Sequence, residues 1–430
     1  MELVIEGRAF YNGKLQSCAI GIDKGRIVAV KKVLKGERHM DFNDRIILPA
    51  AIDPHVHFRD PGMTKKEDFE TGSVSALFGG VSCVLDMPNT KPPLLLREDL
   101  LEKWTIATKK SWTDFGLFGG CSDASDPFRL SKGVIGYKVF MSSTTGGVLL
   151  AEDEEIKRAL DAVKPTGKVV SVHAEDDHMI PKQGDKTRKE ERNLRDHDEA
   201  RPTSAEASAI RRLASLGQAN KINICHVTSR DALEALKGAS FTCEATAHHM
   251  LLDIGCGKGA FGKVNPPLRR KEDKEGLFAA FCAGKIDMLA SDHAPHTTAD
   301  KGEDFDYAPS GMPGVETAFP LMMTFVKREQ MSLATLVRAA CERPAEIFGL
   351  NKGKIAVGRD ADLMVLDPRE MVQISSKKLH SKCGWTAFEG FEAIFPQSTF
   401  LRGKMLTEGG ALLGERMGRD VVVMGKANTY

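Results

Sequence analysis

The chain has no excess of charge of either sign and no long apolar run. Its 60 Lys and Arg residues balance 59 Asp and Glu residues, and the formal net charge is +1. This balance gives no electrostatic reason to expect a nucleic acid or an anionic membrane as partner. No apolar stretch approaches the roughly 20 residues of a membrane span, and the first residues lack the features of a signal peptide. We therefore expect a cytoplasmic protein that acts on a small molecule.

Paired cysteines are lacking as well. No Cys-x-x-Cys pair occurs, and the nine cysteines stand singly at Cys18, Cys83, Cys121, Cys225, Cys243, Cys256, Cys282, Cys341 and Cys383. An odd number of isolated cysteines argues against a disulfide framework and against a structural zinc cluster. What the chain does have is 430 residues with 42% hydrophobic content. That is enough to bury a large core.

From about residue 46, apolar runs alternate with helix-like segments. Eight runs have the length and texture of buried strands, at 47–58, 81–87, 115–120, 134–140, 168–173, 221–226, 241–247 and 286–291. Helical patterns between and after them include 66–77, 96–109, 151–163, 204–216, 231–236 and 271–282. Eight strands alternating with helices predict a (β/α)8 TIM-like barrel over residues 48–347.

The two ends of the chain have a β texture instead. Residues 1–47 show strands and turns without a helical period, and apolar runs return at 353–358, 361–366 and 398–404. We predict one small β-sandwich domain whose halves, residues 1–47 and 348–430, flank the inserted barrel. The long polar stretch 295–314, after the eighth strand, is predicted to be a lid over the site.

Polar side chains that can carry chemistry fall at the ends of the predicted strands. His55 and His57 follow the first apolar run, and because side chains alternate along a strand both imidazoles point the same way. His173 and His226 end the fifth and sixth strands, and Asp292 follows the eighth. Singly, such a histidine is more often a packing residue than a ligand. Together they predict a metal site at the carboxyl end of the barrel.

Lys138 ends the fourth strand and completes this set. Four imidazoles, an aspartate and a lysine suit two divalent ions, most simply zinc. Two such ions about 3.5–4 Å apart need a bridging anion. A neutral lysine amine that takes up CO2 becomes N6-carboxylysine, which is such an anion. The alternative is an ammonium paired with Asp292 or Glu175, and the sequence leaves both open.

Several motifs resemble those of the dihydroorotases, in the single-chain microbial class of the amidohydrolase superfamily. They are Asp-Pro-His-Val-His-Phe-Arg-Asp-Pro-Gly at 53–62, Asp-Met-Pro-Asn-Thr at 86–90, Asn-Pro-Pro-Leu-Arg at 265–269, Ser-Asp-His-Ala-Pro-His-Thr at 291–297 and Gly-Met-Pro-Gly-Val-Glu-Thr at 311–317. The likeness covers nearly the whole chain. Allantoinases, hydantoinases and dihydropyrimidinases share the barrel, but they typically differ at the Arg after the two histidines and at the Met-Pro-Asn-Thr run.

The resemblance implies reversible hydrolysis of (S)-dihydroorotate to N-carbamoyl-L-aspartate in pyrimidine biosynthesis. A metal-bridging hydroxide would attack the ring carbonyl, and Asp292 would act as general base and then as general acid. The planar fork of Arg59 suits bidentate capture of the substrate carboxylate. The substrate contacts that the resemblance implies are Arg59, Asn89, Asn265, His296, Ser310 and Gly311. His248 and His249 are interpreted as structural.

Other interpretations remain open at this point. Asn89 and Asn265 could be turn residues, and His296 could be exposed to solvent. The activity could be that of a hydantoinase or allantoinase, or the chain could be an inactive scaffold homologue, although all six predicted ligand positions are intact. The sequence does not decide between a homodimer and association with aspartate transcarbamoylase. It also leaves open the identity of the metals and the carboxylation of Lys138.

Overall fold

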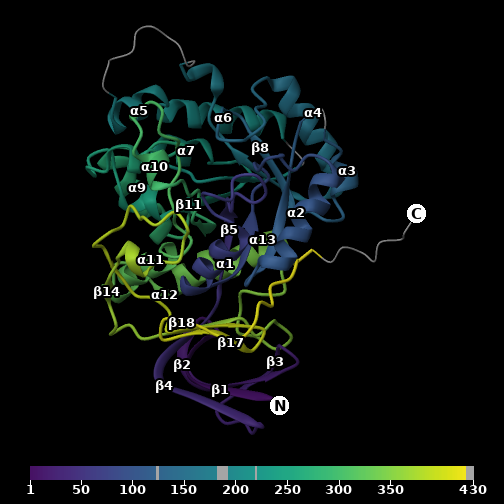
Figure 1. Cartoon of the computed structure of the whole chain (residues 1–430), viewed down its shortest axis with the longest axis vertical. Coiled ribbons are helices and arrows are strands. Elements are labelled where there is room, and N and C mark those ends of the chain that lie inside the picture. Colours follow the sequence, from purple (N-terminus) through teal and green to yellow (C-terminus); the bar gives the residue numbers. More distant parts are fainter. Residues whose placement is uncertain (123–124, 182–191, 218–219, 423–430) are drawn as a thin grey trace.

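The centre of the molecule is a closed barrel of eight parallel strands. The computed structural model describes residues 1–122, 125–181, 192–217 and 220–422 (Figure 1). The strands lie in chain order and are β5 (Ala51–Val56), β6 (Val81–Asp86), β7 (Asp114–Gly120), β8 (Gly136–Phe140), β9 (Val169–His173), β10 (Lys221–Ile224), β11 (Thr242–Thr246) and β12 (Met288–Ala290). A parallel bridge between Val56 and His293 joins the first strand to the segment after the last. The predicted (β/α)8 barrel is therefore confirmed.

Helices surround the barrel (Figure 1). They are α1 (Phe69–Phe78), α2 (Arg97–Lys110), α3 (Pro127–Leu130), α4 (Asp153–Val163), α5 (Leu194–Ala200), α6 (Thr203–Leu216), α7 (Arg230–Ala235), α8 (Ala247–Leu251), α9 (Lys271–Cys282), α10 (Thr298–Lys301), α11 (Ala318–Lys327), α12 (Leu333–Val337) and α13 (Arg343–Phe348). Short 3-10 turns lie at Lys164–Thr166, Asp177–Met179, Gly259–Gly262 and Ser376–Lys378, and a π-turn at Arg338–Glu342. Capping residues mark several starts: the Asp68 carboxylate accepts from the Thr71 N–H, and the Ser229 hydroxyl accepts from the Ala232 N–H. None of the described helices is long and apolar enough to cross a membrane.

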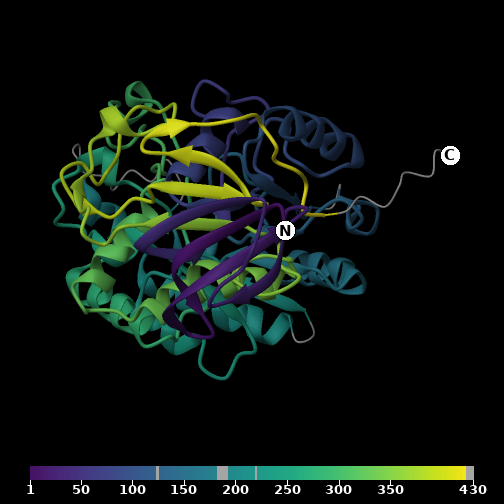
Figure 2. The ribbon, with the colours of Figure 1, turned by 90° about the horizontal axis from the view of Figure 1, so that it is seen from below.

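The two ends of the chain build a second sheet together. Its order is β18-β17-β16-β13-β4-β1-β2-β3, with β1 (Leu3–Tyr11), β2 (Lys14–Asp23), β3 (Arg26–Lys31), β4 (Arg38–Pro49), β13 (Leu363–Leu366), β16 (Ser398–Leu401), β17 (Lys404–Glu408) and β18 (Ala411–Leu412). N-terminal and C-terminal strands lie side by side in it (Figure 2). The small domain is thus one continuous sheet, and Phe42 and Phe400 meet edge to face on it at 6.1 Å. A further pair, β14 (Val372–Gln373) and β15 (Glu392–Ala393), stands apart.

The first predicted strand, 47–58, is in fact two strands of different sheets. The Ala50 N–H donates to the Asp362 carbonyl in the small domain, whereas the Ala51 N–H donates to the Gly80 carbonyl in the barrel. An apolar run without a break carries no sign of this change of partner. Residues 353–358 form no strand, and the stretch 295–314 contains α10. The domain boundaries at 47/48 and 347/348 stay predictions, and residues 423–430 of the last segment lie outside the described residues.

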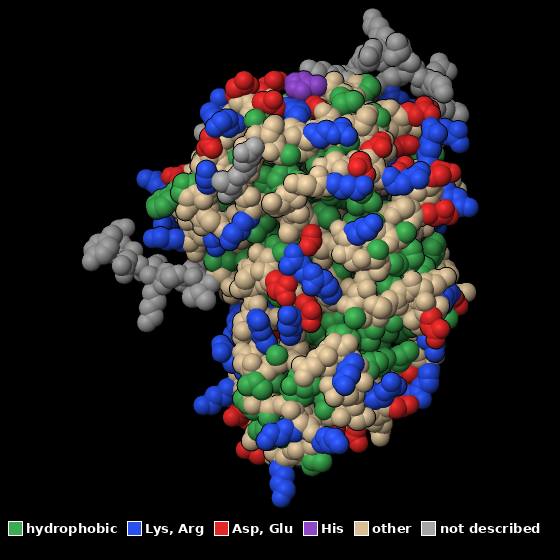
Figure 3. Space-filling view, turned by 180° about the vertical axis from the view of Figure 1, so that it is seen from behind, with side chains coloured by type: hydrophobic (Ala, Val, Ile, Leu, Met, Phe, Trp, Pro, Cys, Tyr) green, Lys and Arg blue, Asp and Glu red, His purple; other side chains and the backbone are tan. Residues whose placement is uncertain are grey.

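The surface seen from behind mixes charges of both signs (Figure 3). This agrees with the near-zero net charge of the chain.

A buried ion cluster joins the barrel to the small sheet. The Lys352 ammonium lies 2.6 Å from a carboxylate oxygen of Asp114, at the start of β7, and 2.6 Å from one of Asp362, beside β13. Asp360 is the third partner, at 3.1 Å. Burial opposes the charge on Lys352, but Asp362 and Asp114 outweigh it and raise the pKa of the amine above its usual value. Lys352 thus links carboxylates contributed by both parts of the fold, and Arg402 and Arg419 supply further positive charge to Asp114 and Asp360.

Replacing this cation tests the cluster. Lys352→Met leaves the buried carboxylate of Asp362 without its cation, and we expect the free energy of unfolding to fall by about 3–5 kcal/mol. Lys354→Met is the control, because Lys354 pairs with Glu346 at the surface, with 37% of its side chain exposed. It should cost below about 1 kcal/mol. Urea titration measures both losses, and equal small losses would contradict the role of Lys352.

Candidate active site

A small polar cavity opens at the carboxyl ends of the barrel strands. All the residues proposed from the sequence line it except His296. The lining also includes side chains that the sequence analysis did not single out, namely Phe140, Thr144, Thr145 and Ala294. The residues were predicted from separate strand ends, and closure of the barrel is what brings them together.

Two imidazoles and a carboxylate converge on one side of the cavity. His57 Nε2 lies 3.1 Å from an oxygen of Asp292, and His55 Nε2 lies 3.4 Å from the same oxygen. These three side chains are buried, and their ligand atoms all lie within 4.8 Å of one another. This spacing fits a single cation bound by all three.

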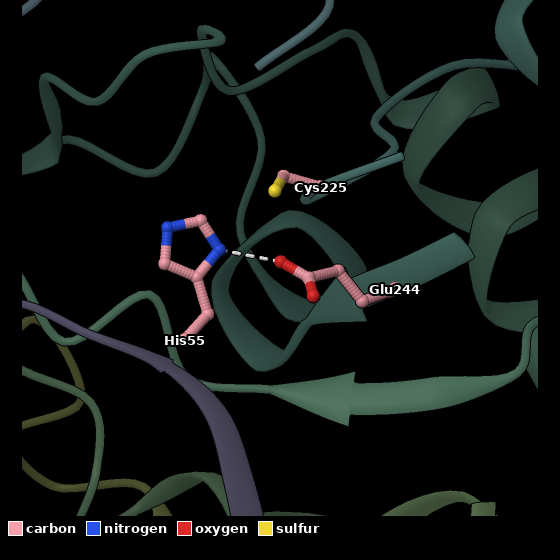
Figure 4. A group of neighbouring side chains, drawn as sticks. All are labelled: His55, Cys225 and Glu244. Carbon is pink, nitrogen blue, oxygen red and sulfur yellow. Dashed lines mark hydrogen bonds and ion pairs between the residues drawn. The ribbon is translucent and has the colours of Figure 1, made fainter. Parts of the chain in front are cut away.

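The opposite nitrogens of both rings are already engaged. His55 Nδ1 lies 2.5 Å from Glu244 Oε1 (Figure 4), and His57 Nδ1 lies 2.7 Å from Asn89 Oδ1. Histidines that bind metals commonly donate their second N–H in this way, which fixes the ring and leaves the other nitrogen for the ion. Sequence reasoning missed Glu244. The sequence feature that could have revealed it is a single acidic residue within β11, a strand that has no other charged residue.

The other two histidines lie next to each other in the cavity lining. His173 Nδ1 lies 3.0 Å from His226 Nε2. His173 Nε2 lies 2.6 Å from Glu175, which Arg201 holds in turn at 2.6 Å. Burial lowers the pKa of both imidazoles below the usual value. They are therefore neutral, which is the form that coordinates a metal.

Lys138 lies between these two groups. Its Nζ is 3.5 Å from His55 Nε2 and donates to Cys225 Sγ at 2.8 Å. Cys225 and Glu244 approach His55 from neighbouring strands (Figure 4). Only 1% of Lys138 is exposed, and within the described ranges no carboxylate pairs with it. The alternative pairing with Asp292 or Glu175 is therefore not the observed arrangement.

The charge of the site favours a cation. Burial and Lys138 oppose a proton on His55, but the negative groups around it, led by Glu244, raise its pKa to about 10. Burial raises the pKa of Asp292, but His55 and His57 outweigh it and hold the pKa well below the usual range. The negative groups around His55 and the ionised Asp292 attract positive charge, so the pocket suits divalent metal ions. The donor set of imidazole nitrogens and a carboxylate also matches them.

Three residues of the site have a left-handed backbone. The φ angles of Arg59, His226 and Asp292 are 61°, 35° and 44°. Such conformations cost about 1–3 kcal/mol each for residues other than glycine, and they concentrate at functional positions.

On the substrate side, Arg59 Nε donates to the Pro295 carbonyl at 3.3 Å, and Asn89 Nδ2 donates to the Thr145 carbonyl at 2.8 Å. Gly311 has a φ of 137°, and a Cβ there would lie 2.5 Å from the Ala294 carbonyl oxygen, so the backbone itself forms the wall.

The position of His296 contradicts the alternative that this residue is exposed to solvent. It is fully buried rather than exposed, and it lies behind the cavity wall with its Nε2 3.0 Å from the Ser310 carbonyl oxygen. His249 bonds to Thr246 and to the Pro266 carbonyl, in keeping with a structural role.

Hydrogen bonds from Lys301 fix the predicted lid, residues 295–314. The Lys301 ammonium donates to the carbonyls of Lys263, Pro309 and Gly311 at 2.9–3.1 Å. Opening of this segment stays a prediction.

Comparison with known proteins places the chain in a family. A family model described as "Amidohydrolase family" matches residues 46–406. The chain belongs to the amidohydrolase family. Curated relatives of this amidohydrolase include a dihydroorotase of Methanosarcina mazei, 39% identical over 93% of this chain and 92% of the relative. A dihydroorotase of Thermoplasma volcanium is 37% identical over 98% of each chain.

Solved structures with the same fold as this amidohydrolase carry the names of other enzymes. An L-hydantoinase from Arthrobacter aurescens has a TM-score of 0.90 and 28% identity, covering 96% of this chain and 98% of its own. A dihydropyrimidinase from Brevibacillus agri has a TM-score of 0.88 and 27% identity, covering 98% of each chain. Because the fold is shared among enzymes with different names, the substrate has to be argued from the site.

Proposed function

We propose that this amidohydrolase is a zinc-dependent dihydroorotase, which interconverts (S)-dihydroorotate and N-carbamoyl-L-aspartate in pyrimidine synthesis. The observation that carries the proposal is Arg59. Only 3% of it is exposed, it lines the cavity, and no carboxylate of the described residues lies within 4.0 Å of its guanidinium. A buried cation without an anionic partner is costly. A substrate carboxylate would supply that partner, and dihydroorotate has one whereas hydantoin and allantoin do not.

Residues on both sides of the cavity would hold two zinc ions, with Lys138 as a bridging N6-carboxylysine. The six ligands are His55, His57, Lys138, His173, His226 and Asp292. When bound, the ions would supply hydroxide near neutral pH and polarise the scissile carbonyl. The buried amine of Lys138, with sulfur and imidazole as its neighbours, is placed to react with CO2.

The protein's own groups then position the ring and move the proton. Arg59 and Asn89 would bind the carboxylate, with His296 as a further donor. Asn265, Ser310 and Gly311 would border the ring. Asp292, ionised and at the centre of the ligand group, would accept the proton of the nucleophile and deliver it to the leaving ring nitrogen. In the direction of ring closure the same groups act in reverse.

A substrate panel tests the activity. The purified enzyme, loaded with zinc, is assayed with dihydroorotate, hydantoin and allantoin at equal concentrations. We expect hydrolysis of dihydroorotate and formation of the ring from N-carbamoyl-L-aspartate. A higher kcat/KM for hydantoin or allantoin would assign the chain to the alternative, and no turnover of any of the three would support the inactive scaffold.

Metal content and mass test the cofactor. The active protein should hold two zinc ions per chain, and native mass spectrometry of the intact, folded protein should find about 44 Da of additional mass, that of CO2. An unmodified Lys138 in a fully active sample would exclude the carboxylysine. The cytoplasmic location stays a prediction. A homodimer and association with aspartate transcarbamoylase also stay predictions, and light scattering with and without that enzyme would test both.

A further inference from the structure

Lys66, which belongs to none of the groups described so far, is bonded to His296. Its Nζ lies 2.9 Å from His296 Nδ1. It precedes α1 in the chain, whereas His296 follows β12, so the contact joins segments 230 residues apart. The same ammonium lies 3.4 Å from a carboxylate oxygen of Asp300, in α10. Lys66 is thus held between the ring of His296 and the first turn of that helix.

This contact fixes where the proton of His296 sits. An ammonium only donates hydrogen bonds, so His296 Nδ1 must accept and carries no hydrogen. Nε2 then carries the hydrogen and donates to the Ser310 carbonyl at 3.0 Å. Arg59 Nη2, 3.3 Å from Nε2, is also a donor and cannot bond to a nitrogen that carries a hydrogen. The N–H of His296 therefore points to the side of the ring where Arg59 and Ser310 line the cavity.

The charges around His296 keep it neutral. Burial has the largest effect, and the three cations facing the ring, Arg59, Lys66 and Lys301, act in the same direction. Together they lower the pKa of the imidazole far below its usual value. Lys301, itself mostly buried, has a pKa lowered to about 7. Asp300, a negative group in α10, pairs with Lys66 rather than with the ring.

We propose that Lys66 is a positioning residue for recognition of the substrate carboxylate: by bonding to Nδ1 it holds His296 as the neutral tautomer whose Nε2–H is a donor beside Arg59. The inference rests on the proposed function, because it concerns the carboxylate that Arg59 would bind. Arg59 contributes charge, and His296 contributes a directed neutral donor whose hydrogen the Ser310 carbonyl accepts in this structure. Neither Lys66 nor His296 lines the cavity, so Lys66 would act on the carboxylate through His296 at the cavity wall.

Three variants separate this role from a general effect of charge. Lys66→Met removes the donor and the charge, Lys66→Arg keeps both, and Lys65→Met removes the same charge from the neighbouring, exposed position. We expect Lys66→Met to raise KM for dihydroorotate about 10-fold or more, with kcat changed far less. Lys66→Arg should restore most of the affinity. Lys65→Met should behave like the parent enzyme.

The kinetic outcomes that would contradict this role are specific. Unchanged KM in Lys66→Met, or a rise of KM in Lys65→Met equal to that in Lys66→Met, would overturn the proposal.

The tautomer can also be read without activity. In protein labelled with 15N-histidine, the ring signals of His296, assigned by comparison with His296→Gln, should show an unprotonated Nδ1 and a protonated Nε2. A protonated Nδ1 in the parent protein would refute the proposal even if Lys66→Met fails to fold. If the parent hydrolyses no dihydroorotate, the proposed function fails, and the tautomer measurement still decides whether Lys66 sets the state of His296.

Discussion

Asp292→Asn is expected to keep the fold and most of the bound metal but to lose about 10³-fold or more in kcat. An amide oxygen cannot take up the proton that the carboxylate accepts, and positioned acid–base groups contribute about 10²–10⁴-fold. The amide remains able to bind as a neutral ligand, and four histidines and Lys138 remain in place. Steady-state kinetics at saturating metal, with metal analysis of the same sample, measures the loss.

Asp287→Asn is the matched control. Asp287 directly precedes β12, at the end of the barrel opposite to Asp292, and pairs with Arg343 at 2.6 Å. Its replacement should leave kcat unchanged at a temperature where the protein stays folded. Full activity of metal-replete Asp292→Asn would exclude the proton-transfer role.

Arg59→Met is expected to lower kcat/KM for dihydroorotate by about 10²–10³-fold, because a buried charge pair loses its cation. Burial lowers the pKa of the Arg59 guanidinium to about 10 in the free enzyme. The group is therefore charged at neutral pH and loses its proton as pH rises through about 10. In the parent enzyme KM should rise in that range, and in Arg59→Met this part of the pH dependence should vanish.

Arg230→Met controls for the loss of a positive charge, since Arg230 is 61% exposed at the side-chain level and outside the cavity lining. It should leave KM unaltered. If KM and kcat of Arg59→Met both equal those of the parent enzyme, the carboxylate does not bind at Arg59, and the case for dihydroorotate over hydantoin loses its main support.

Local pattern determined much of this fold. The period-two alternation of an extended chain predicts His55 and His57 on one side, and both imidazoles do approach Asp292 although β5 ends at Val56. The predicted helix 271–282 has the observed bounds of α9 because its pattern and ends are local features. The prediction of one strand at 47–58 was wrong because the features that divide it are not local. Its hydrogen-bond partners, near residues 362 and 80, are remote in sequence, and only they reveal that the chain changes sheets after Pro49.

The sequence by itself determined which polar side chains are proposed as ligands and substrate contacts, and near which strand ends they stand. Only the tertiary structure decided how each is oriented, because that depends on partners from distant segments. Glu244, 189 residues from His55, engages Nδ1 and so turns Nε2 toward Asp292. Lys66 sets the proton of His296 in the same way. Barrel closure brings these pairs together, and no pattern within either segment encodes the contact.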